Sequence, residues 1–320
     1  MAENVKIIKG TSLWSDAWKR LLKNKLAVFG LIVLAIMVLL VTFGPAIIYW
    51  TTGFTADAFP DDGSLLKSFP PSLSHPMGTD EGGRDMFARV LQGGRISLMV
   101  GIISTVVSLI VGVSYGAIAG YLGGRIDNLM MRIVDMIYAI PYILIVIVLL
   151  SVFGGQNTPA WIKFLSERFG GTGNQGLSQI FLLFFALGLV SWLTMARVVR
   201  GQVLSIKNQE FALAAKATGV STFGIIFRHL VPNTLGPVIV YATLTVPSVM
   251  LTEAFLSYLG LGVQAPFASW GSLAADGVKN IAIFPWQLIF PGVTMALTLF
   301  SLNFLGDGLR DALDPQTRKF

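Results

Sequence analysis

Apolar and polar positions along this chain are separated into long blocks rather than alternating at short range. Four blocks contain no Asp, Glu, Lys or Arg, and they cover residues 26–56, 96–124, 169–196 and 280–306. A helix needs about 20 mostly apolar residues to cross the hydrocarbon core of a bilayer, so each block is long enough. The pattern therefore predicts spans over 27–49, 96–122, 177–196 and 284–305.

Two further apolar stretches each contain one acid, and we interpret both as spans. Residues 133–153 include Asp135, and residues 235–260 include Glu253. One ionisable group does not exclude a span, because such a group can face protein or a water-filled cavity. The predicted fold class is an all-α polytopic membrane protein with six transmembrane helices.

The amino-acid composition excludes several classes of protein. Hydrophobic residues make up 54% of the 320 residues and charged residues 12%, whereas a typical globular domain has about 25% charged residues. These values exclude a soluble enzyme, a disordered chain and a nucleic-acid-binding domain. The chain has no cysteine, so disulfides and thiol chemistry are excluded.

The net charge of +6 indicates a membrane topology. Lys and Arg are retained in cytoplasmic loops. Segments 1–25, 123–132, 197–233 and 306–320 hold 16 of the 23 basic residues, and segments 50–95, 154–176 and 263–283 hold seven. The N-terminus and C-terminus are therefore both predicted inside. The predicted parts are a cytoplasmic segment 1–26, a first span 27–49, an extracytoplasmic loop 50–95, a core 96–306 and a cytoplasmic tail 307–320.

The N-terminal segment has an amphipathic pattern. One helical face carries Trp14, Trp18, Leu21 and Leu22, and the other carries Lys19, Arg20 and Lys23. This pattern is typical of a helix lying on the inner membrane surface. A stop-transfer flank with incidental tryptophans explains it equally well.

The long outer loop has several prolines and a run from His75 to Arg89 that is predicted to be ordered. We expect ion pairs among Arg84, Asp85 and Arg89. A metal site at His75 with Asp80, Glu81 and Asp85 is the alternative, and a salt-bridged loop is the preferred interpretation.

Four glycines are spaced four residues apart at the end of the second predicted span: Gly112, Gly116, Gly120 and Gly124. Residues at this spacing share one helix face, and small residues there allow another helix to approach closely. The ladder predicts a helix-packing face, within this chain or with a partner.

The two intramembrane acids allow different interpretations. Asp135 follows Arg132 by three residues, and an i, i+3 ion pair is preferred over a role in a transport path. Glu253 has no basic residue in its own span. A role in a gate or path and a helix–helix hydrogen bond remain equally open for Glu253.

The inner segment 197–233 predicts a helix, a turn and a second short helix. Asn208 is the expected N-cap, Glu210 suits the first turn, and Gly219 ends the first helix. Ser221 is expected to cap the second helix, which would run through Arg228 and end at Pro232. Ala212, Ala215 and Gly219 give a smooth face for a groove in another protein, with charge from Lys207, Lys216 and Arg228. An ordinary solvated loop is the alternative.

The run Glu210-Phe-Ala-Leu-Ala-Ala-Lys-Ala-Thr-Gly219, with Ile225-Ile-Phe-Arg-His-Leu-Val-Pro-Asn233, resembles the EAA loop of bacterial ABC importer permeases. Ala214, Ala215, Gly219 and Pro232 match that pattern at its spacing. Leu213, His229 and Val231 depart from it in the manner of the peptide-transporter branch. The run His75–Asp85, the segment Tyr121-Leu-Gly-Gly and the run Leu256-Ser-Tyr-Leu-Gly-Leu-Gly resemble the same branch, so the resemblance covers nearly the whole chain.

The resemblance implies the type I ABC importer permease fold and the second, C-type permease of a dipeptide or oligopeptide importer in a prokaryotic cytoplasmic (inner) membrane. Its ATPase-coupling residues would be Glu210, Ala212, Ala214, Ala215, Lys216, Gly219, Arg228 and Pro232. It implies partners in a second homologous permease, two cytoplasmic ATPases and an extracytoplasmic solute-binding protein, with a peptide as substrate and no nucleic acid.

The same resemblance implies that ATP and Mg are held by the ATPases, and that this chain is non-catalytic with no cofactor or metal of its own. The sequence has no G-x-x-x-x-G-K-[ST] phosphate loop. A nickel or other small-solute permease is an alternative within the family. Alternatives of other classes are a proton-coupled transporter using Asp135 and Glu253, and a membrane enzyme using His75 with Asp80 or Asp85.

Overall fold

The computed structural model describes residues 13–57, 68–170 and 175–313, and almost all of its regular structure is helical. The helices, in chain order, are α1 (Leu13–Leu21), α2 (Lys25–Thr52), α3 (Met86–Leu122), α4 (Gly124–Tyr138), α5 (Tyr142–Phe153), η1 (Gly155–Asn157), α6 (Ala160–Gly170), α7 (Gln175–Ile206), α8 (Glu210–Ala217), α9 (Thr222–Gly224), η2 (Ile225–Leu230), α10 (Val231–Tyr258), α11 (Trp270–Lys279) and α12 (Trp286–Leu313).

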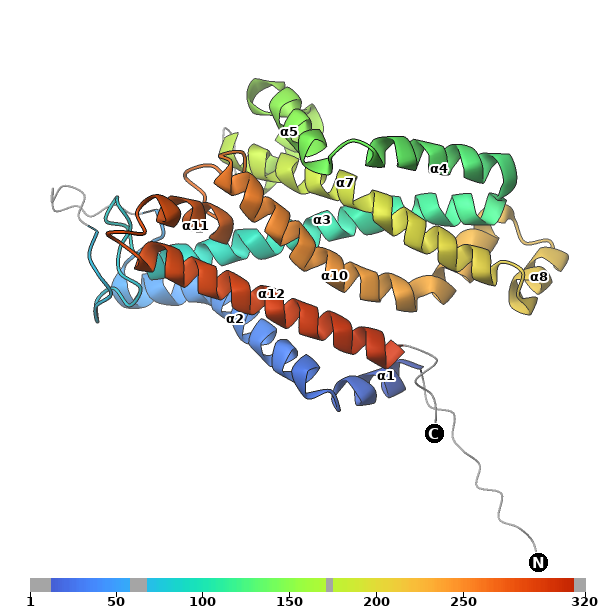
Figure 1. Cartoon of the computed structure of the whole chain (residues 1–320), viewed down its shortest axis with the longest axis horizontal. Coiled ribbons are helices and arrows are strands. Elements are labelled where there is room, and N and C mark those ends of the chain that lie inside the picture. Colours follow the sequence, from blue (N-terminus) through green and yellow to red (C-terminus); the bar gives the residue numbers. More distant parts are fainter. Residues whose placement is uncertain (1–12, 58–67, 171–174, 314–320) are drawn as a thin grey trace, which may run out of the picture.

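Long apolar helices run side by side along the longest axis of the molecule (Figure 1). Within the described residues, five helical stretches are long and apolar enough to cross a membrane: α2, α3, α7, the run Thr222–Tyr258 that ends with α10, and α12. The pair α4 and α5 supplies a sixth span if it crosses as one unit. The all-α polytopic class is confirmed, and the six-span count depends on this pair.

The third predicted span is not one helix over 133–153. α4 and α5 meet at an angle of 82° around the break at Ala139–Pro141. Proline has no N–H to donate and disfavours helical geometry in the residue before it, so Pro141 accounts for the break. In the sequence, the position of Pro141 indicates this helix break, whereas hydropathy does not.

Charge-free blocks also underestimated the length of several helices, most clearly α3 and α7. α3 starts at Met86 rather than at 96, because Asp85 caps it by accepting a hydrogen bond of 2.7 Å from the amide of Ala88. α7 continues to Ile206 rather than ending near 196. A charge-free block marks only the apolar part of a helix, and both helices extend through charged residues beyond it.

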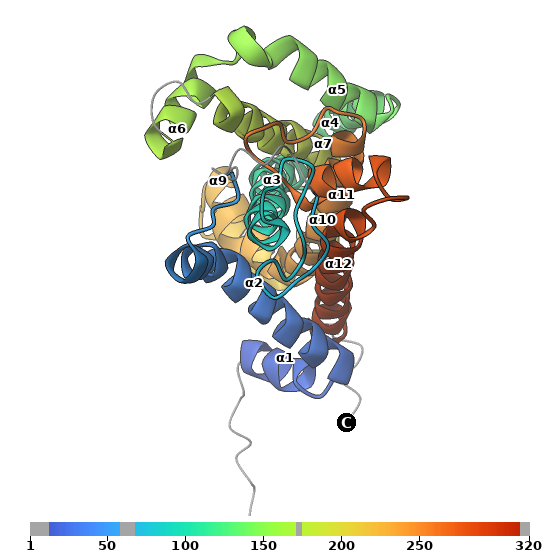
Figure 2. The same cartoon turned by 90° about the vertical axis from the view of Figure 1, so that its left-hand side faces the viewer.

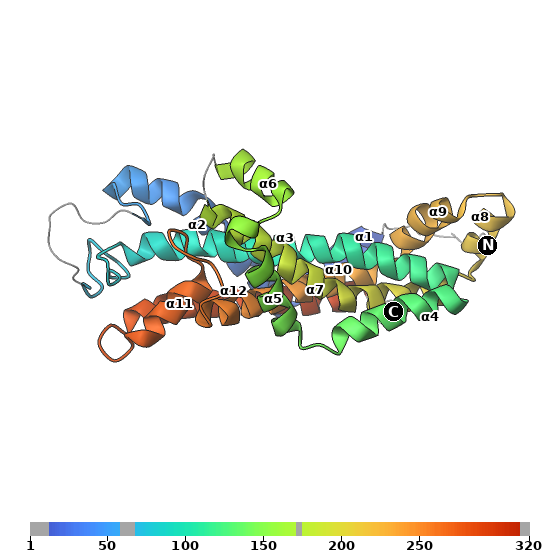
Figure 3. The same cartoon turned by 90° about the horizontal axis from the view of Figure 1, so that it is seen from above.

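The two ends of the molecule differ in architecture (Figures 1 and 3). α8, α1 and the last turns of α12 lie toward one end, and α11 and the loop of residues 68–85 lie at the other. The segment 197–233 and the helices nearest both chain ends are thus on one side, as the topology prediction requires. The side of the membrane that this end faces stays a prediction.

Ion pairs stabilise residues 68–85, the described part of the loop before α3, although they are not the expected pairs. Asp80 binds Arg84 at 2.8 Å and also Arg89, whereas Asp85 binds the ring of His75 at 2.8 Å. Asp80 is therefore the centre of the cluster that was predicted around Asp85. The carbonyl of Thr79 accepts hydrogen bonds from Trp286 and Gln287, which fixes the loop on the start of α12.

α1 packs on the end of α12 through one part of its apolar face. Ala17 and Leu21 are buried in a cluster with Ala312, while Trp18 and Leu22 are about half exposed. The predicted amphipathic helix therefore exists, with an exposed apolar edge available to a membrane surface. The side chain of Trp14 lies outside the described residues. Figure 2 shows α1 and α2 on the opposite side of the bundle from α4, α5 and α6.

Candidate functional site

The inner segment 197–233 forms a helical element at one end of the bundle (Figure 3). α8 begins at Glu210 and ends before Gly219, which adopts φ +80 and lets the amide of Val220 bond back to the carbonyl of Ala215 at 3.1 Å. Glycine tolerates this left-handed conformation without a Cβ penalty. The next short helix is capped by Ser221, whose hydroxyl accepts from the amide of Gly224 at 3.2 Å. The predictions for Gly219 and Ser221 are confirmed.

Other details of this element differ from the sequence prediction. The N-cap of α8 is Gln209, without a side-chain cap, so Asn208 does not fill that role. The second helix does not end at Arg228 or Pro232, because the π-helix η2 leads directly into α10. Pro232 lies in the first turn of α10, directly after η2, so it does not end the helix.

The small-residue face of α8 is turned inward. Ala212 and Ala215 are buried in one cluster with Ile225, Ile226 and Leu230, so they do not form the docking face that was predicted. The opposite side is exposed: Leu213 is 51% exposed, Ala214 and Lys216 are exposed, and Phe223 nearby is 71% exposed. Lys207 is also not on this surface, because its ammonium donates to the carbonyl of Gly120 at 2.9 Å.

The glycine ladder packs α3 against α7 inside this chain. A Cβ at Gly112 would lie 2.6 Å from Met195 Cβ, and one at Gly116 would lie 2.3 Å from the carbonyl oxygen of Ala196. A Cβ at Gly120 would lie 3.0 Å from the carbonyl oxygen of Arg200. Gly124 is not part of the ladder, because it starts α4 with φ +57 and a Cβ there would meet nothing within 4 Å.

Two acids of α4 bind arginines of α7. Asp135 accepts from Arg197 at 2.7 Å rather than from Arg132, so the predicted i, i+3 pair is wrong. Asp127, which the sequence analysis did not single out, makes a two-pronged contact with Arg200 at 2.6 and 2.7 Å. The Asp135 side chain is 65% exposed and that of Asp127 only 8%, so Asp127 is the stronger anchor of α4.

Glu253 is buried between α10 and the start of α11. Its carboxylate accepts from Ser257 at 2.6 Å and from Ser269 at 2.7 Å, and Ser269 is the N-cap of α11. The sequence analysis left two alternatives for Glu253, a role in a gate or path and a helix–helix hydrogen bond. These contacts show the hydrogen bond, between α10 and the N-cap of α11. A cavity beside the break between α4 and α5, described next, is lined by the adjacent Thr252 but not by Glu253.

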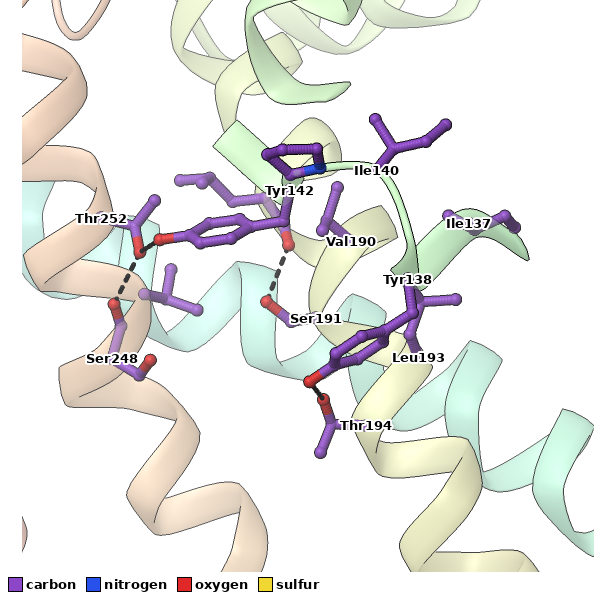
Figure 4. Close-up of a pocket in the computed structure, with 13 residues that line it drawn as sticks. Ile137, Tyr138, Ile140, Tyr142, Val190, Ser191, Leu193, Thr194, Ser248 and Thr252 are labelled. Atoms are coloured by element: carbon purple, nitrogen blue, oxygen red, sulfur yellow. Dashed lines mark hydrogen bonds between the residues drawn. The ribbon is translucent and has the colours of Figure 1, made fainter. Parts of the chain in front are cut away.

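A cavity of about 390 Å³ lies beside the break between α4 and α5. Its walls come from that break, from Leu187 to Thr194 of α7 and from Ser248 to Thr252 of α10, and none of its thirteen lining residues is charged. Figure 4 shows Tyr142 reaching across to Thr252 and Tyr138 reaching to Thr194. The hydroxyl–hydroxyl distances are 2.9 Å and 3.4 Å.

Comparison with known families now adds to this geometry. Residues 112–319 match the family described as the binding-protein-dependent transport system inner membrane component. The chain belongs to this family. Residues 12–66 also match the N-terminal transmembrane domain of oligopeptide transport permease C.

Curated relatives of this permease match along nearly their whole length. The oligopeptide transport system permease protein OppC of Bacillus subtilis is 43% identical over 311 residues, covering 97% of this chain and 92% of the relative. OppC of Escherichia coli K12 is 46% identical, covering 97% and 94%. The dipeptide transport system permease protein DppC of Bacillus subtilis is 44% identical, covering 96% and 87%. The permease is thus a multi-pass inner-membrane component of a binding-protein-dependent transport system.

Sequence reasoning missed the hydroxyl groups of this permease's cavity. They lie on three separate spans, at Tyr138 and Tyr142, at Ser191 and Thr194, and at Ser248 and Thr252. Hydroxyl residues are common in transmembrane helices, so no single position was conspicuous. Pro141 between the two tyrosines was the available signal, because a broken helix inside a membrane has to be accommodated by its surroundings.

Proposed function

We propose that this chain is one of two permease subunits of an ATP-driven importer for dipeptides and oligopeptides. The main support is the near full-length similarity to OppC and DppC relatives. The exposed element at α8 supplies the second requirement, a surface on which separate ATPases can act. A second homologous permease would complete the pore, and an extracytoplasmic binding protein would deliver the solute.

The ATPase contact is proposed on the exposed side of α8, around Leu213, Lys216 and Phe223. An apolar side chain that is half or more exposed, next to a lysine, is typical of an interface core with a polar rim. The buried side of α8, at Ala212 and Ala215, joins the element to the bundle. This division lets α8 transmit force from the ATPases without separating from its own chain.

The test is Leu213→Asp in the complete transporter, reconstituted with its binding protein in proteoliposomes. A charge in this contact should reduce ATP-driven peptide uptake and the yield of co-purified ATPase. The matched control is Leu73→Asp, because Leu73 is fully exposed in the loop at the opposite end of the molecule. If Leu213→Asp imports peptide and retains its ATPase as well as both Leu73→Asp and the unmodified transporter, α8 is not the ATPase contact.

The same proteoliposomes distinguish the ATP-driven peptide permease from the two alternatives, a proton-coupled transporter and a nickel permease. A proton-coupled transporter would lose uptake when an uncoupler is added while ATP is maintained, and an ATP-driven permease would keep it. A nickel permease would show uptake of nickel that excess peptide does not inhibit. ATP hydrolysis itself is proposed to occur on the partner ATPases, with ATP and Mg bound there.

A further inference from the structure

The break between α4 and α5 indicates which side of this chain meets the transported molecule. Ala139, Ile140 and Pro141 are exposed, and Pro141 is the N-cap residue of α5 without a side-chain cap hydrogen bond. The amides of Ala139 and Ile140 bond back to carbonyls of α4, but the ends of two helices leave other backbone groups without a helical partner. Irregular backbone at membrane depth lies against protein or a water-filled cavity, because lipid supplies no hydrogen-bond partner. The surface at this break therefore faces water or protein rather than lipid tails.

Beside the break, hydroxyl groups form a continuous strip. The cavity of about 390 Å³ adjoins a second one of about 200 Å³, which continues between α7 and α10. Both cavities are lined by Ser191, Thr194 and Ser248, and the second adds Tyr241 and Thr245. None of the residues that line either cavity carries a formal charge. At its edge the Arg197 guanidinium lies 4.2 Å from the centre of the Tyr138 ring and is paired with Asp135, so the adjacent charges sum to zero and the strip is polar without a net charge.

Counting protons shows that two hydroxyl oxygens of the strip, those of Tyr142 and Ser191, are available as acceptors. A hydroxyl has one proton and two acceptor lone pairs. Thr252 donates its proton to the carbonyl of Ser248 at 2.9 Å, so the phenol of Tyr142 has to be the donor in their 2.9 Å contact (Figure 4). Ser191 likewise donates to the carbonyl of Leu187 at 2.8 Å. The oxygens of Tyr142 and Ser191 keep lone pairs for a ligand that donates hydrogen bonds.

We propose that this strip is a subsite for the main chain of the transported peptide, in which Tyr142 and Ser191 accept hydrogen bonds from its amide N–H groups. Every peptide carries these donors whatever its side chains, and a neutral wall neither attracts nor repels acidic or basic side chains. The volume of the larger cavity falls within the usual range of small-molecule sites, about 300–1,000 Å³. The proposal rests on the proposed function, because it names the substrate groups that this permease would contact.

The experiment pairs the protein change Tyr142→Phe with a change in the peptide. The complete transporter, with its binding protein, is reconstituted in proteoliposomes, and initial uptake is measured for trialanine and for trialanine in which both peptide N–H groups are N-methylated. The binding protein is the same throughout, so its own preference cancels from the double-mutant cycle. Tripeptides with a central lysine or glutamate test whether side-chain charge matters.

With the unmodified peptide, Tyr142→Phe should lower uptake about two- to tenfold, the range for one neutral hydrogen bond. It should change uptake of the N-methylated peptide far less, and the loss should be alike for the lysine and glutamate peptides. The control is Tyr115→Phe, because Tyr115 donates to the carbonyl of Met130 at 2.9 Å and lines neither cavity. If Tyr142→Phe reduces assembly of the transporter, Ser191→Ala provides a second, independent double-mutant cycle with the same two peptides.

Four outcomes would overturn the inference. Equal losses for both peptides, or no loss for either, would mean that Tyr142 does not contact the main chain, while the proposed function would stand. A loss seen only with the lysine peptide or only with the glutamate peptide would show side-chain selection and would overturn it too. If the wild-type transporter imports no peptide, the proposed function fails and this inference fails with it.

Discussion

The substitution Gly116→Ala tests how closely α3 and α7 must approach. A Cβ at Gly116 would lie 2.3 Å from the carbonyl oxygen of Ala196, which belongs to helix backbone and cannot rotate away. Optimal contact distances between such atoms are about 3.5–4.0 Å. The two helices would therefore have to separate locally by about 1 Å. Overpacking of this kind costs about 1–3 kcal/mol.

Two controls isolate that cost from helix propensity. Alanine is favoured over glycine in a helix by about 1 kcal/mol, which would partly mask the clash. A Cβ at Gly201 in α7 or at Gly292 in α12 would meet nothing within 4 Å, so alanine there should be neutral or stabilising in this chain. The expected difference in free energy of unfolding between Gly116→Ala and these controls is about 1–3 kcal/mol.

The assay is unfolding of the purified protein by a denaturing detergent, starting from mild detergent and followed by circular dichroism. The loss should be largest for Gly116→Ala. It should be smaller for Gly112→Ala, where the closest approaches are 2.6 Å to Met195 Cβ and 2.9 Å to the carbonyl oxygen of Trp192, and smallest for Gly120→Ala, where the closest approach is 3.0 Å. If Gly116→Ala is as stable as Gly201→Ala, the close packing of α3 and α7 is refuted.

The same assay tests the two ion pairs between α4 and α7: Asp127→Ala should cost about 1–3 kcal/mol because its carboxylate is buried and doubly bonded. Asp135→Ala should lower the free energy of unfolding by less than about 1 kcal/mol because that pair is exposed. Equal losses for Asp127→Ala and Asp135→Ala would contradict the conclusion that Asp127 is the stronger anchor of α4. Glu253→Gln keeps an acceptor for Ser257 and Ser269, so ATP-driven uptake should persist with an unchanged pH profile; abolished uptake would refute a purely structural role. Glu253→Leu leaves both hydroxyls without that acceptor and should cost about 1–3 kcal/mol.

The spans were predictable because hydropathy reports directly on transfer into a bilayer. The six apolar blocks correspond to the five long helices and the α4–α5 pair. The boundaries were less predictable, since Asp85 and Arg200 lie in the cap or the interior of helices that continue past the apolar part. Hydropathy also could not show the 82° bend, which depends on a single residue, Pro141.

The site was predictable where local backbone geometry decides it. Gly219 and Ser221 act as helix stop and cap because each needs only its own neighbours in sequence. The direction in which α8 faces depends instead on which surface its alanines meet, and Ala212 and Ala215 meet the chain's own η2. Partners across the bundle, such as Arg197 for Asp135, depend on the tertiary packing of separate helices and could not be read from spacing alone.

One apolar cluster packs α8 against α3 and α7. Ala212 and Ala215 of α8, Val199 and Val203 of α7 and Ala117 of α3 are all buried in it. Because protein interiors are closely packed and resist compression, a displacement of α8 is expected to move α3 and α7 with it. Helix α7 also forms one wall of the cavity and α10 forms another. Movement of α8 should therefore change the width of the cavity at the α4–α5 break, which is how force from an ATPase would reach the transported molecule.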